Sequence, residues 1–220
     1  MGADAVSENR FEVLFVCTAN QCRSPIAEFL LRAELDALNL DGPWLVSSAG
    51  IAARDGDPIH PLVDQLLASR GLSTKGWQSK RLTPSIVAPA DLILTATAVH
   101  RRAVVVAEPR SIRRTHVLRQ FADLCDVELP PGAQGSAAGH ALLTAALAAR
   151  PLVPVPRAGE KDLSDPIGRP YDAFERCAAT ISESFRRILR PVSEQVWGHL
   201  QSPPSATPRD GQHHRPDQPA

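Results

Sequence analysis

Residues 13–31 read VLFVCTANQCRSPIAEFLL, and this stretch decides the fold. It begins inside the apolar run 11–16, which is interrupted only by Glu12 and predicts a buried strand of a parallel sheet. Ser24 and Pro25 then favour the start of a helix, with Ser24 as the capping residue and Pro25 at the first helical position. Apolar residues at helical spacing give that helix one buried face: Ile26, Phe29, Leu30, Ala33 and Ala37.

The loop between this strand and this helix holds the reactive residues. Cys17 and Arg23 stand at its two ends, with five residues between them. A loop that closes on a helix N-terminus directs several backbone N–H groups at one point, where the helix dipole also favours an anion. Arg23 adds a planar pair of donors that matches two phosphate oxygens. A thiol in such a field ionises readily, so we expect Cys17 to be a thiolate poised to attack phosphorus.

These residues resemble the opening of the low-molecular-weight protein tyrosine phosphatases, in which a strand, the motif C-x5-R-[S/T]-P and a helix lie near the N-terminus. Asn20, Cys22 and Glu28 extend the match beyond the motif itself. The same opening motif begins the related thiol-dependent arsenate reductases, so the loop alone indicates the superfamily and leaves the reaction open.

The cysteine pair also has two plainer interpretations. In the first interpretation, the two residues are buried structural thiols, Cys17 and Cys22, since burial is the usual state of a free cysteine. In the second interpretation, the two cysteines form half of a zinc site. Zinc requires two further ligands at close spacing, but Cys125 and Cys177 stand without a nearby histidine. The strand–loop–helix context favours the phosphate loop, and we expect no metal and no cofactor.

The length and composition predict one domain. The chain has 220 residues, 43% of them hydrophobic, which is enough for a single core over residues 10–200. Residues 1–9 and 201–220 are expected to be disordered ends, the second because it holds five prolines and no large apolar residue.

Charge and cysteine content exclude several classes of protein. Lys+Arg and Asp+Glu both number 24, so nothing indicates nucleic acid or an anionic membrane as a partner. Four cysteines are too few for a secreted disulfide scaffold. The N-terminus has no apolar signal core, and no later run is long enough to span a bilayer. We therefore expect a cytoplasmic protein, a compartment that suits a catalytic thiol.

Three further strands are predicted after the first, over residues 44–48, 90–95 and 115–118. They alternate with helices, so the fold class is α/β, a doubly wound four-stranded parallel sheet flanked by helices. The family resemblance implies the same flavodoxin-like three-layer arrangement. The closing helix is predicted over residues 171–189, with Pro191 expected to end or kink it. Ligands bind beyond the carboxyl ends of such strands, where Cys17 stands.

The resemblance also implies a catalytic acid late in the chain, in an aspartate–proline pair just before the final helix. Asp165 and Pro166 occupy this place. The family's aspartate protonates the leaving oxygen and then activates water, a function worth roughly 100- to 10,000-fold in rate. Two alternatives stay open: Asp-Pro pairs are common turn residues, and Asp162 lies close by.

Residues around the loop both match the family and depart from it. The resemblance implies that Ser48, at the end of the second strand, supports Asn20, although a serine that simply ends a strand is the alternative. Trp77 stands where the bacterial family usually has a histidine, and packing is an alternative role for this residue. Ile167 stands where many tyrosine phosphatases have an aromatic wall, and Tyr171 is a possible substitute further along.

The sequence therefore predicts a cysteine-dependent phosphomonoesterase, a protein-tyrosine-phosphatase-like hydrolase, with Cys17, Arg23 and Asp165 as catalytic residues. A phosphorylated protein or a small phosphomonoester is the expected substrate. The rest of the loop is expected to bind the phosphoryl group: Thr18, Ala19, Asn20, Gln21, Cys22 and Ser24. Ser24 is also expected to donate a hydrogen bond to the thiolate.

Two alternative functions remain. A thiol-coupled arsenate reductase needs a close pair of relay cysteines after the third strand, but Cys125 and Cys177 are far apart in the sequence. A catalytically weak phosphate- or partner-binding protein is the other alternative, motivated by Trp77 and Ile167.

A redox function is predicted for Cys22. A second thiol in the loop can trap oxidised Cys17 as a reversible disulfide, with a thiol reductant as the partner that restores it. The alternative is that Cys22 only packs beneath the loop.

Overall fold

The computed structural model describes residues 10–40 and 42–201, the last five of them as backbone only. The predicted N-terminal segment 1–9 lies outside these residues, as does the tail from residue 202 onward. The predicted α/β architecture is confirmed: four parallel strands form one sheet in the order β2-β1-β3-β4. The strands are β1 (Phe11–Cys17), β2 (Trp44–Gly50), β3 (Leu92–Thr95) and β4 (Thr115–Val117).

Strand β1 lies in the middle of the sheet and is buried on both faces. Phe11, Val13 and Phe15 point into the larger core, whereas Leu14 and Val16 point into a smaller core on the opposite face. This explains why the run from residue 11 is nearly continuous in apolar residues rather than alternating.

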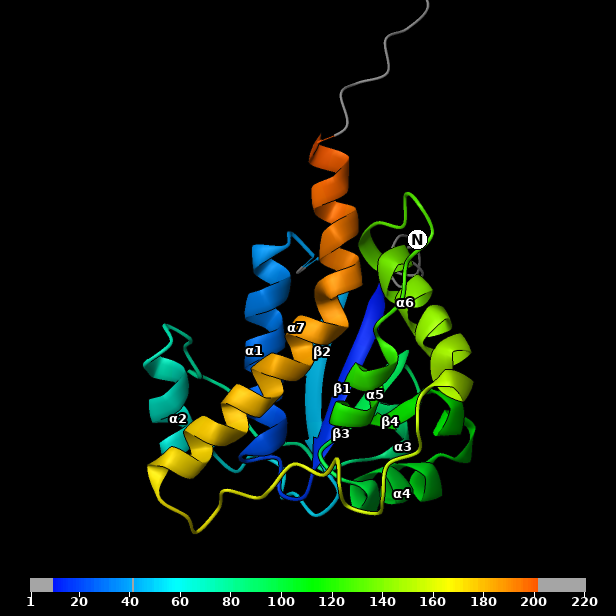
Figure 1. Ribbon diagram of the computed structural model, residues 1–220. Coiled ribbons are helices and arrows are strands. Elements are labelled where there is room, and N and C mark those ends of the chain that lie inside the picture. Colours follow the sequence, from blue (N-terminus) through cyan, green and yellow to red (C-terminus); the bar gives the residue numbers. More distant parts are fainter. Residues whose placement is uncertain (1–9, 41, 202–220) are drawn as a thin grey trace, which may run out of the picture.

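Helices cover both faces of the sheet (Figure 1). The larger core is covered by α1 (Arg23–Ala37), α2 (Pro61–Ala68), α5 (Leu118–Leu124), α6 (Gly135–Ala149) and α7 (Tyr171–Gln201). The smaller core is covered by α3 (Pro84–Val87) and α4 (Ala98–Ala107). Two short 3-10 helices complete the elements, η2 (Pro109–Arg114) and η3 (Arg150–Leu152).

Helix α7 crosses the larger core and contacts α1, α5 and α6 (Figure 1). Its predicted apolar stripe is buried, from Phe174 to Val192, and Phe185 packs against Phe15 at a ring distance of 5.5 Å. The helix does not end near Pro191 but continues to Gln201, and Figure 1 shows it bending on the way. A proline removes one backbone hydrogen bond but kinks rather than breaks a helix that packing holds on both sides.

The strand order places the loop after β1 at a topological switch point. Neighbours β3 and β2 lie on opposite sides of β1, and the chain leaves β1 in one direction to form β2 and later returns on the other side to form β3. Crevices at such points, outside the carboxyl ends of the strands, are where α/β sheets bind ligands. In the described part of the chain, no helix has the length and apolar character needed to cross a membrane.

Candidate active site

The loop between β1 and α1 begins at Cys17, the last residue of β1, and passes directly into the helix at Arg23. The helix therefore starts one residue earlier than Ser24, and Ser24 is not its cap. Cys22 occupies the capping position without a side-chain hydrogen bond. Ser24 does not cap the helix because its hydroxyl is engaged inside the loop, where it contacts the thiol of Cys17.

Ser24 is buried beside the thiol. Its Oγ lies 3.0 Å from Cys17 Sγ and accepts a hydrogen bond of 2.9 Å from Asn20 Nδ2. The one hydroxyl proton of Ser24 then faces the sulfur at 3.0 Å or the more distant Ala49 carbonyl at 3.4 Å. This geometry suits donation to a thiolate, because a charged acceptor forms the stronger bond.

Asn20 holds the shape of the loop. It is fully buried in the left-handed region, with φ 55°, a conformation that asparagine tolerates better than most residues. Its Nδ2 donates to Ser24 and, at 2.8 Å, to Ser48 Oγ, while its Oδ1 accepts from the backbone N–H of Lys80 at 2.8 Å. The side-chain amide thus ties the loop to α1, to β2 and to the segment around residue 80.

The loop also packs tightly on Gly50, which pairs with Cys17 across β1 and β2. A Cβ atom at this position would lie 2.6 Å from the Thr18 carbonyl oxygen and 2.7 Å from the Asn20 nitrogen. Only glycine allows the backbone of the loop to come this close.

A buried carboxylate supports the loop from behind. Glu28 accepts a hydrogen bond of 2.5 Å from Ser48 Oγ and one of 3.2 Å from Trp77 Nε1, and Arg32 pairs with it at 2.6 Å. Trp77 is therefore a hydrogen-bond donor to the network. Its place in the family segment that usually carries a histidine was the signal for this role.

Arg23 joins the loop to a distant part of the chain. Its Nη2 donates to Asp165 Oδ2 at 2.6 Å and to Thr18 Oγ1 at 3.2 Å, and its Nη1 lies 3.4 Å from the Leu163 carbonyl oxygen. Among the described residues its buried Nε finds no acceptor. Asp162 lies apart from this cluster, because its carboxylate accepts the backbone N–H of Ala98 at 2.9 Å.

Sequence reasoning missed His100. Its Nε2 lies 2.9 Å from Thr18 Oγ1, and its Nδ1 lies 2.7 Å from Thr97 Oγ1. Burial, together with the charge of Arg23, lowers the pKa of His100 to about 4, so the ring is neutral near pH 7. The only sequence signal was its position shortly after the carboxyl end of β3, the edge where site residues gather.

The remaining thiols are held in the protonated form. All four cysteines are free and buried. Burial raises the pKa of Cys22 above its ordinary range and raises those of Cys125 and Cys177 to about 12. No group of three or more His, Cys, Asp or Glu side chains within residues 10–40 and 42–201 is placed to hold a metal ion.

Comparison with known proteins identifies the family. Residues 12–151 match the family model described as low molecular weight phosphotyrosine protein phosphatase. The chain belongs to this family. As a low-molecular-weight phosphatase, it carries the thiol, arginine and serine of the loop within the matched segment, whereas Asp165 lies beyond it.

Three relatives illustrate the range of the family. The chain is 26% identical over 191 residues to a low molecular weight protein-tyrosine-phosphatase of Streptomyces coelicolor, covering 86% of this chain and 97% of that protein. It is 30% identical over 120 residues to a protein-arginine-phosphatase of Geobacillus stearothermophilus, covering 54% and 76%. The crystal structure of a low molecular weight protein tyrosine phosphatase from T. tengcongensis superimposes with a TM-score of 0.61 at 25% identity, covering 82% and 98%.

We predict that Trp77→Phe lowers both stability and turnover. The variant loses the indole N–H that donates to Glu28. A hydrogen bond to a charged group contributes about 1.5–3 kcal/mol to stability. With this anchor gone, the Glu28 carboxylate holds Ser48 less firmly, and kcat for an aryl phosphate should fall severalfold. Chemical unfolding and steady-state kinetics measure the two effects.

Trp44→Phe is the matched control, because Trp44 donates its indole N–H to the Gly135 carbonyl oxygen at 3.0 Å, far from the loop. This variant should lose stability while keeping its kcat. Trp77→His restores a ring N–H and should recover part of the turnover. Equal kcat values in wild type and Trp77→Phe would contradict a positioning role.

A second prediction concerns pH and His100. Unfolded histidine takes up a proton below about pH 6.5, whereas folded His100 does so only near its lowered pKa of about 4. Acid therefore favours the unfolded state, and stability should be lost as the pH falls from about 6.5 towards 4. His116, whose pKa is also lowered to about 4 by burial, acts in the same direction.

The free energy of unfolding should accordingly fall between about pH 7.5 and pH 5, and it should fall less in His100→Gln than in wild type. Urea unfolding at the two pH values measures this difference. An identical pH dependence in the two proteins would show that His100 is not held neutral by the fold.

Proposed function

We propose that this low-molecular-weight phosphatase hydrolyses phosphotyrosine in proteins through a phosphocysteine intermediate on Cys17. The observation that carries the proposal is a convergence on one loop. Cys17 Sγ lies 3.0 Å from Ser24 Oγ, and Arg23 of the same loop lies 2.6 Å from Asp165. A thiol, a hydroxyl donor, a guanidinium and a carboxylic acid are the groups that phosphoryl transfer through sulfur requires.

In the first step, the Cys17 thiolate attacks phosphorus in line with the bond to the leaving oxygen. The sulfur–phosphorus bond forms as the phosphorus–oxygen bond breaks. Arg23 and the backbone N–H groups of residues 18–24 bind the three equatorial oxygens, where negative charge is concentrated. Asp165 gives its proton to the leaving oxygen, so that the product departs as a neutral phenol.

In the second step, the Asp165 carboxylate takes a proton from water as that water attacks phosphorus. The sulfur–phosphorus bond breaks, phosphate leaves, and the Cys17 thiolate is regenerated with Ser24 as its hydrogen-bond donor. Asp165 ends the cycle protonated, ready for the next substrate.

Substrate binding has to rearrange the pair of Arg23 and Asp165. In the free protein the two side chains neutralise each other, and Arg23 Nε lacks an acceptor within the described residues. A phosphate dianion gives Arg23 two oxygens to bind in a bidentate manner.

Phosphotyrosine is the preferred substrate class because the family model and the Streptomyces coelicolor relative carry this specificity in their descriptions. The Geobacillus stearothermophilus relative is described as an arginine phosphatase, so phosphoarginine is the alternative to test. Ile167, which follows the Asp165–Pro166 pair, is 44% exposed and offers an apolar contact for an aromatic ring.

The buried thiols argue against an arsenate reductase. Such an enzyme passes electrons through a relay of reactive cysteines, but Cys125 donates its S–H to the Phe121 carbonyl oxygen and its thiol pKa is about 12. Cys177 is likewise buried and protonated. Thiols of this kind are poor attacking groups near pH 7.

Cys22 does not compete with Cys17 as the nucleophile, because burial raises the pKa of its thiol and keeps it protonated. Its proposed function is protective. A peroxide oxidises the Cys17 thiolate to a sulfenic acid. The hydroxide that leaves this sulfur takes the proton of the Cys22 thiol, so a disulfide forms with loss of water although Cys22 is protonated at rest. A thiol reductant regenerates both thiols.

Kinetics with an aryl phosphate, a phosphotyrosine peptide and a phosphoarginine peptide test the proposal. Cys17→Ser should abolish turnover, since a serine hydroxyl at this position is a far weaker nucleophile. Asp165→Asn should lower kcat by roughly 100- to 10,000-fold, because asparagine cannot donate the proton.

Asp162→Asn is the matched control and should retain most of the activity, since Asp162 binds the N-terminus of α4 instead of Arg23. Full activity in Cys17→Ser or in Asp165→Asn would overturn the mechanism. Hydrolysis of the phosphoarginine peptide without hydrolysis of the phosphotyrosine peptide would show that phosphoarginine, and not phosphotyrosine, is the substrate class.

A further inference from the structure

A cavity of about 690 Å³ lies beside Asp165, on the side of α7. The segment 162–169 forms one wall, α7 forms a second wall through Arg176 and Cys177, and Arg119 of α5 completes the lining. This segment runs below α5 and then turns into α7 in Figure 1. The cavity is therefore next to the group that the mechanism places at the leaving oxygen.

Three arginines line this cavity, and two of them have no carboxylate partner among the described residues. Arg119 donates only to the carbonyl oxygens of Glu160 and Asp162, at 3.1 and 3.5 Å, so its charge is not neutralised. Arg169 makes no side-chain hydrogen bond or ion pair within the described part of the chain. Arg176 pairs with Asp172 on the exposed surface of α7.

The carboxylates of the lining are already engaged. Asp165 is paired with Arg23, and Asp162 accepts the backbone N–H of Ala98. Three arginines against two aspartates leave the lining with an excess of positive charge. Guanidinium groups that are not matched by acids attract oxyanions and bind them in a bidentate manner.

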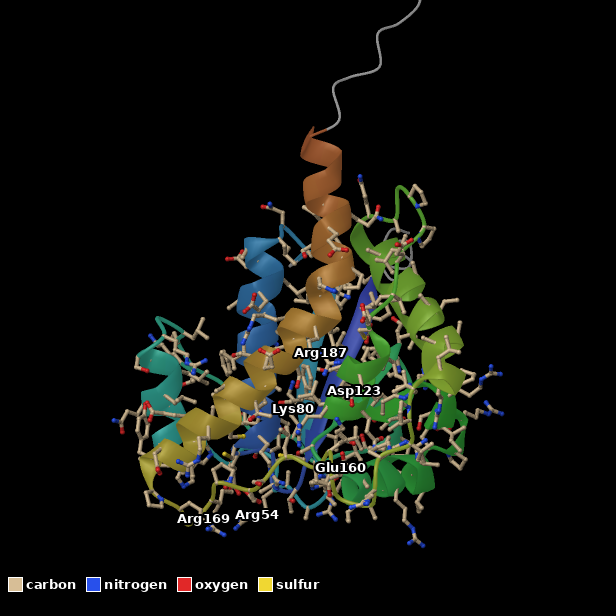
Figure 2. The ribbon with its side chains drawn as sticks, viewed as in Figure 1. Arg54, Lys80, Asp123, Glu160, Arg169 and Arg187 are labelled. Atoms are coloured by element: carbon tan, nitrogen blue, oxygen red, sulfur yellow. The ribbon has the colours of Figure 1, made fainter. Side chains whose placement is uncertain are left out.

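Arg169 is held close to the catalytic acid by a tight turn. Its backbone N–H donates to the Pro166 carbonyl oxygen at 2.9 Å, and Gly168 takes a φ of 76° within the turn. Figure 2 shows Arg169 at the lower edge of the molecule, the edge at which the strands of the sheet end. The turn thus keeps a cation close in the chain to Asp165.

We propose that this arginine-lined cavity binds a second oxyanion of the substrate, carried by a residue near the phosphotyrosine in the same peptide. The inference rests on the proposed function and specifies its substrate class as acidic phosphopeptides. The oxyanion is a carboxylate side chain or a second phosphoryl group. The chain lacks an aromatic wall at Ile167, and recognition by charge through Arg169 takes its place.

The test compares three phosphotyrosine peptides that are equal in length: a neutral one, one with glutamates beside the phosphotyrosine, and one with a phosphoserine there. We expect kcat/KM for both acidic peptides to exceed that for the neutral peptide by about 10-fold at low salt, mainly through KM. The preference should shrink as the salt concentration rises to about 0.5 M, because the charges are partly exposed.

Arg169→Gln should reduce this preference by about 5-fold, and the double variant Arg169→Gln/Arg176→Gln should reduce it further. Arg110→Gln is the matched control: it removes the same charge from an exposed arginine of η2, which packs against α4, and it should leave the preference unchanged. An advantage for the phosphoserine peptide alone supports the cavity and narrows its ligand to a phosphoryl group.

Two results would overturn the inference: equal kcat/KM values for the three peptides in wild type, or an unchanged preference in Arg169→Gln. The dissociation constants of the same peptides for the Cys17→Ser variant give a second readout that does not need turnover. If wild type fails to hydrolyse even an aryl phosphate, the proposed function fails. The dissociation constants still decide on the cavity, and equal values for acidic and neutral peptides refute it.

Discussion

The side-chain amide of Asn20 is the contact on which the rest of the site depends. A loop that points its N–H groups inward cannot hold that shape by its own backbone bonds, so it must be tied from outside. Asn20 provides the ties from a left-handed conformation, with hydrogen bonds to Ser24, Ser48 and the backbone of Lys80. These partners come from α1, β2 and the segment before α3, which are assembled only when the sheet and its flanking helices are in place. An anion site that is organised before the substrate arrives need not reorganise during the reaction.

The pair of Arg23 and Asp165 closes the site from the other end of the chain. The two residues are separated by more than half of the sequence, yet they meet at 2.6 Å because α7 packs across α1 and fixes the segment that precedes it. Two further side chains support the loop from opposite sides. Trp77 donates to Glu28 behind the loop, and the neutral ring of His100 braces Thr18 at its front. These groups lie around the loop, whereas Ile167 and Arg169 are exposed at the rim of the site.

Much of this could be predicted from the sequence because the signals are local. The apolar run of β1, the five-residue loop and the alternation of strands with helices each occupy a short stretch, and they were sufficient for the fold class and the strand positions. The start of α1 was misplaced because Ser24 looks like a helix cap, whereas its hydroxyl is used by Cys17 and Asn20. Pro191 was expected to end or kink α7, and the helix bends but continues to Gln201 because packing on both sides carries it past the proline. The role of His100 could not be predicted because its partners are distant in sequence and no periodicity reports a tertiary hydrogen bond. The position of Trp77 pointed to the network behind the loop but not to its hydrogen bond with Glu28.

The proposed mechanism requires that Cys17 becomes phosphorylated during turnover. The direct measurement is acid quenching of the wild-type protein within the first turnovers of an aryl phosphate that carries radioactive phosphorus, followed by proteolysis and mass spectrometry of the labelled peptide. We predict that label appears on the peptide that contains Cys17, as a phosphoryl group bound to its sulfur. Turnover without any labelled peptide, or label on a residue other than Cys17, would contradict it.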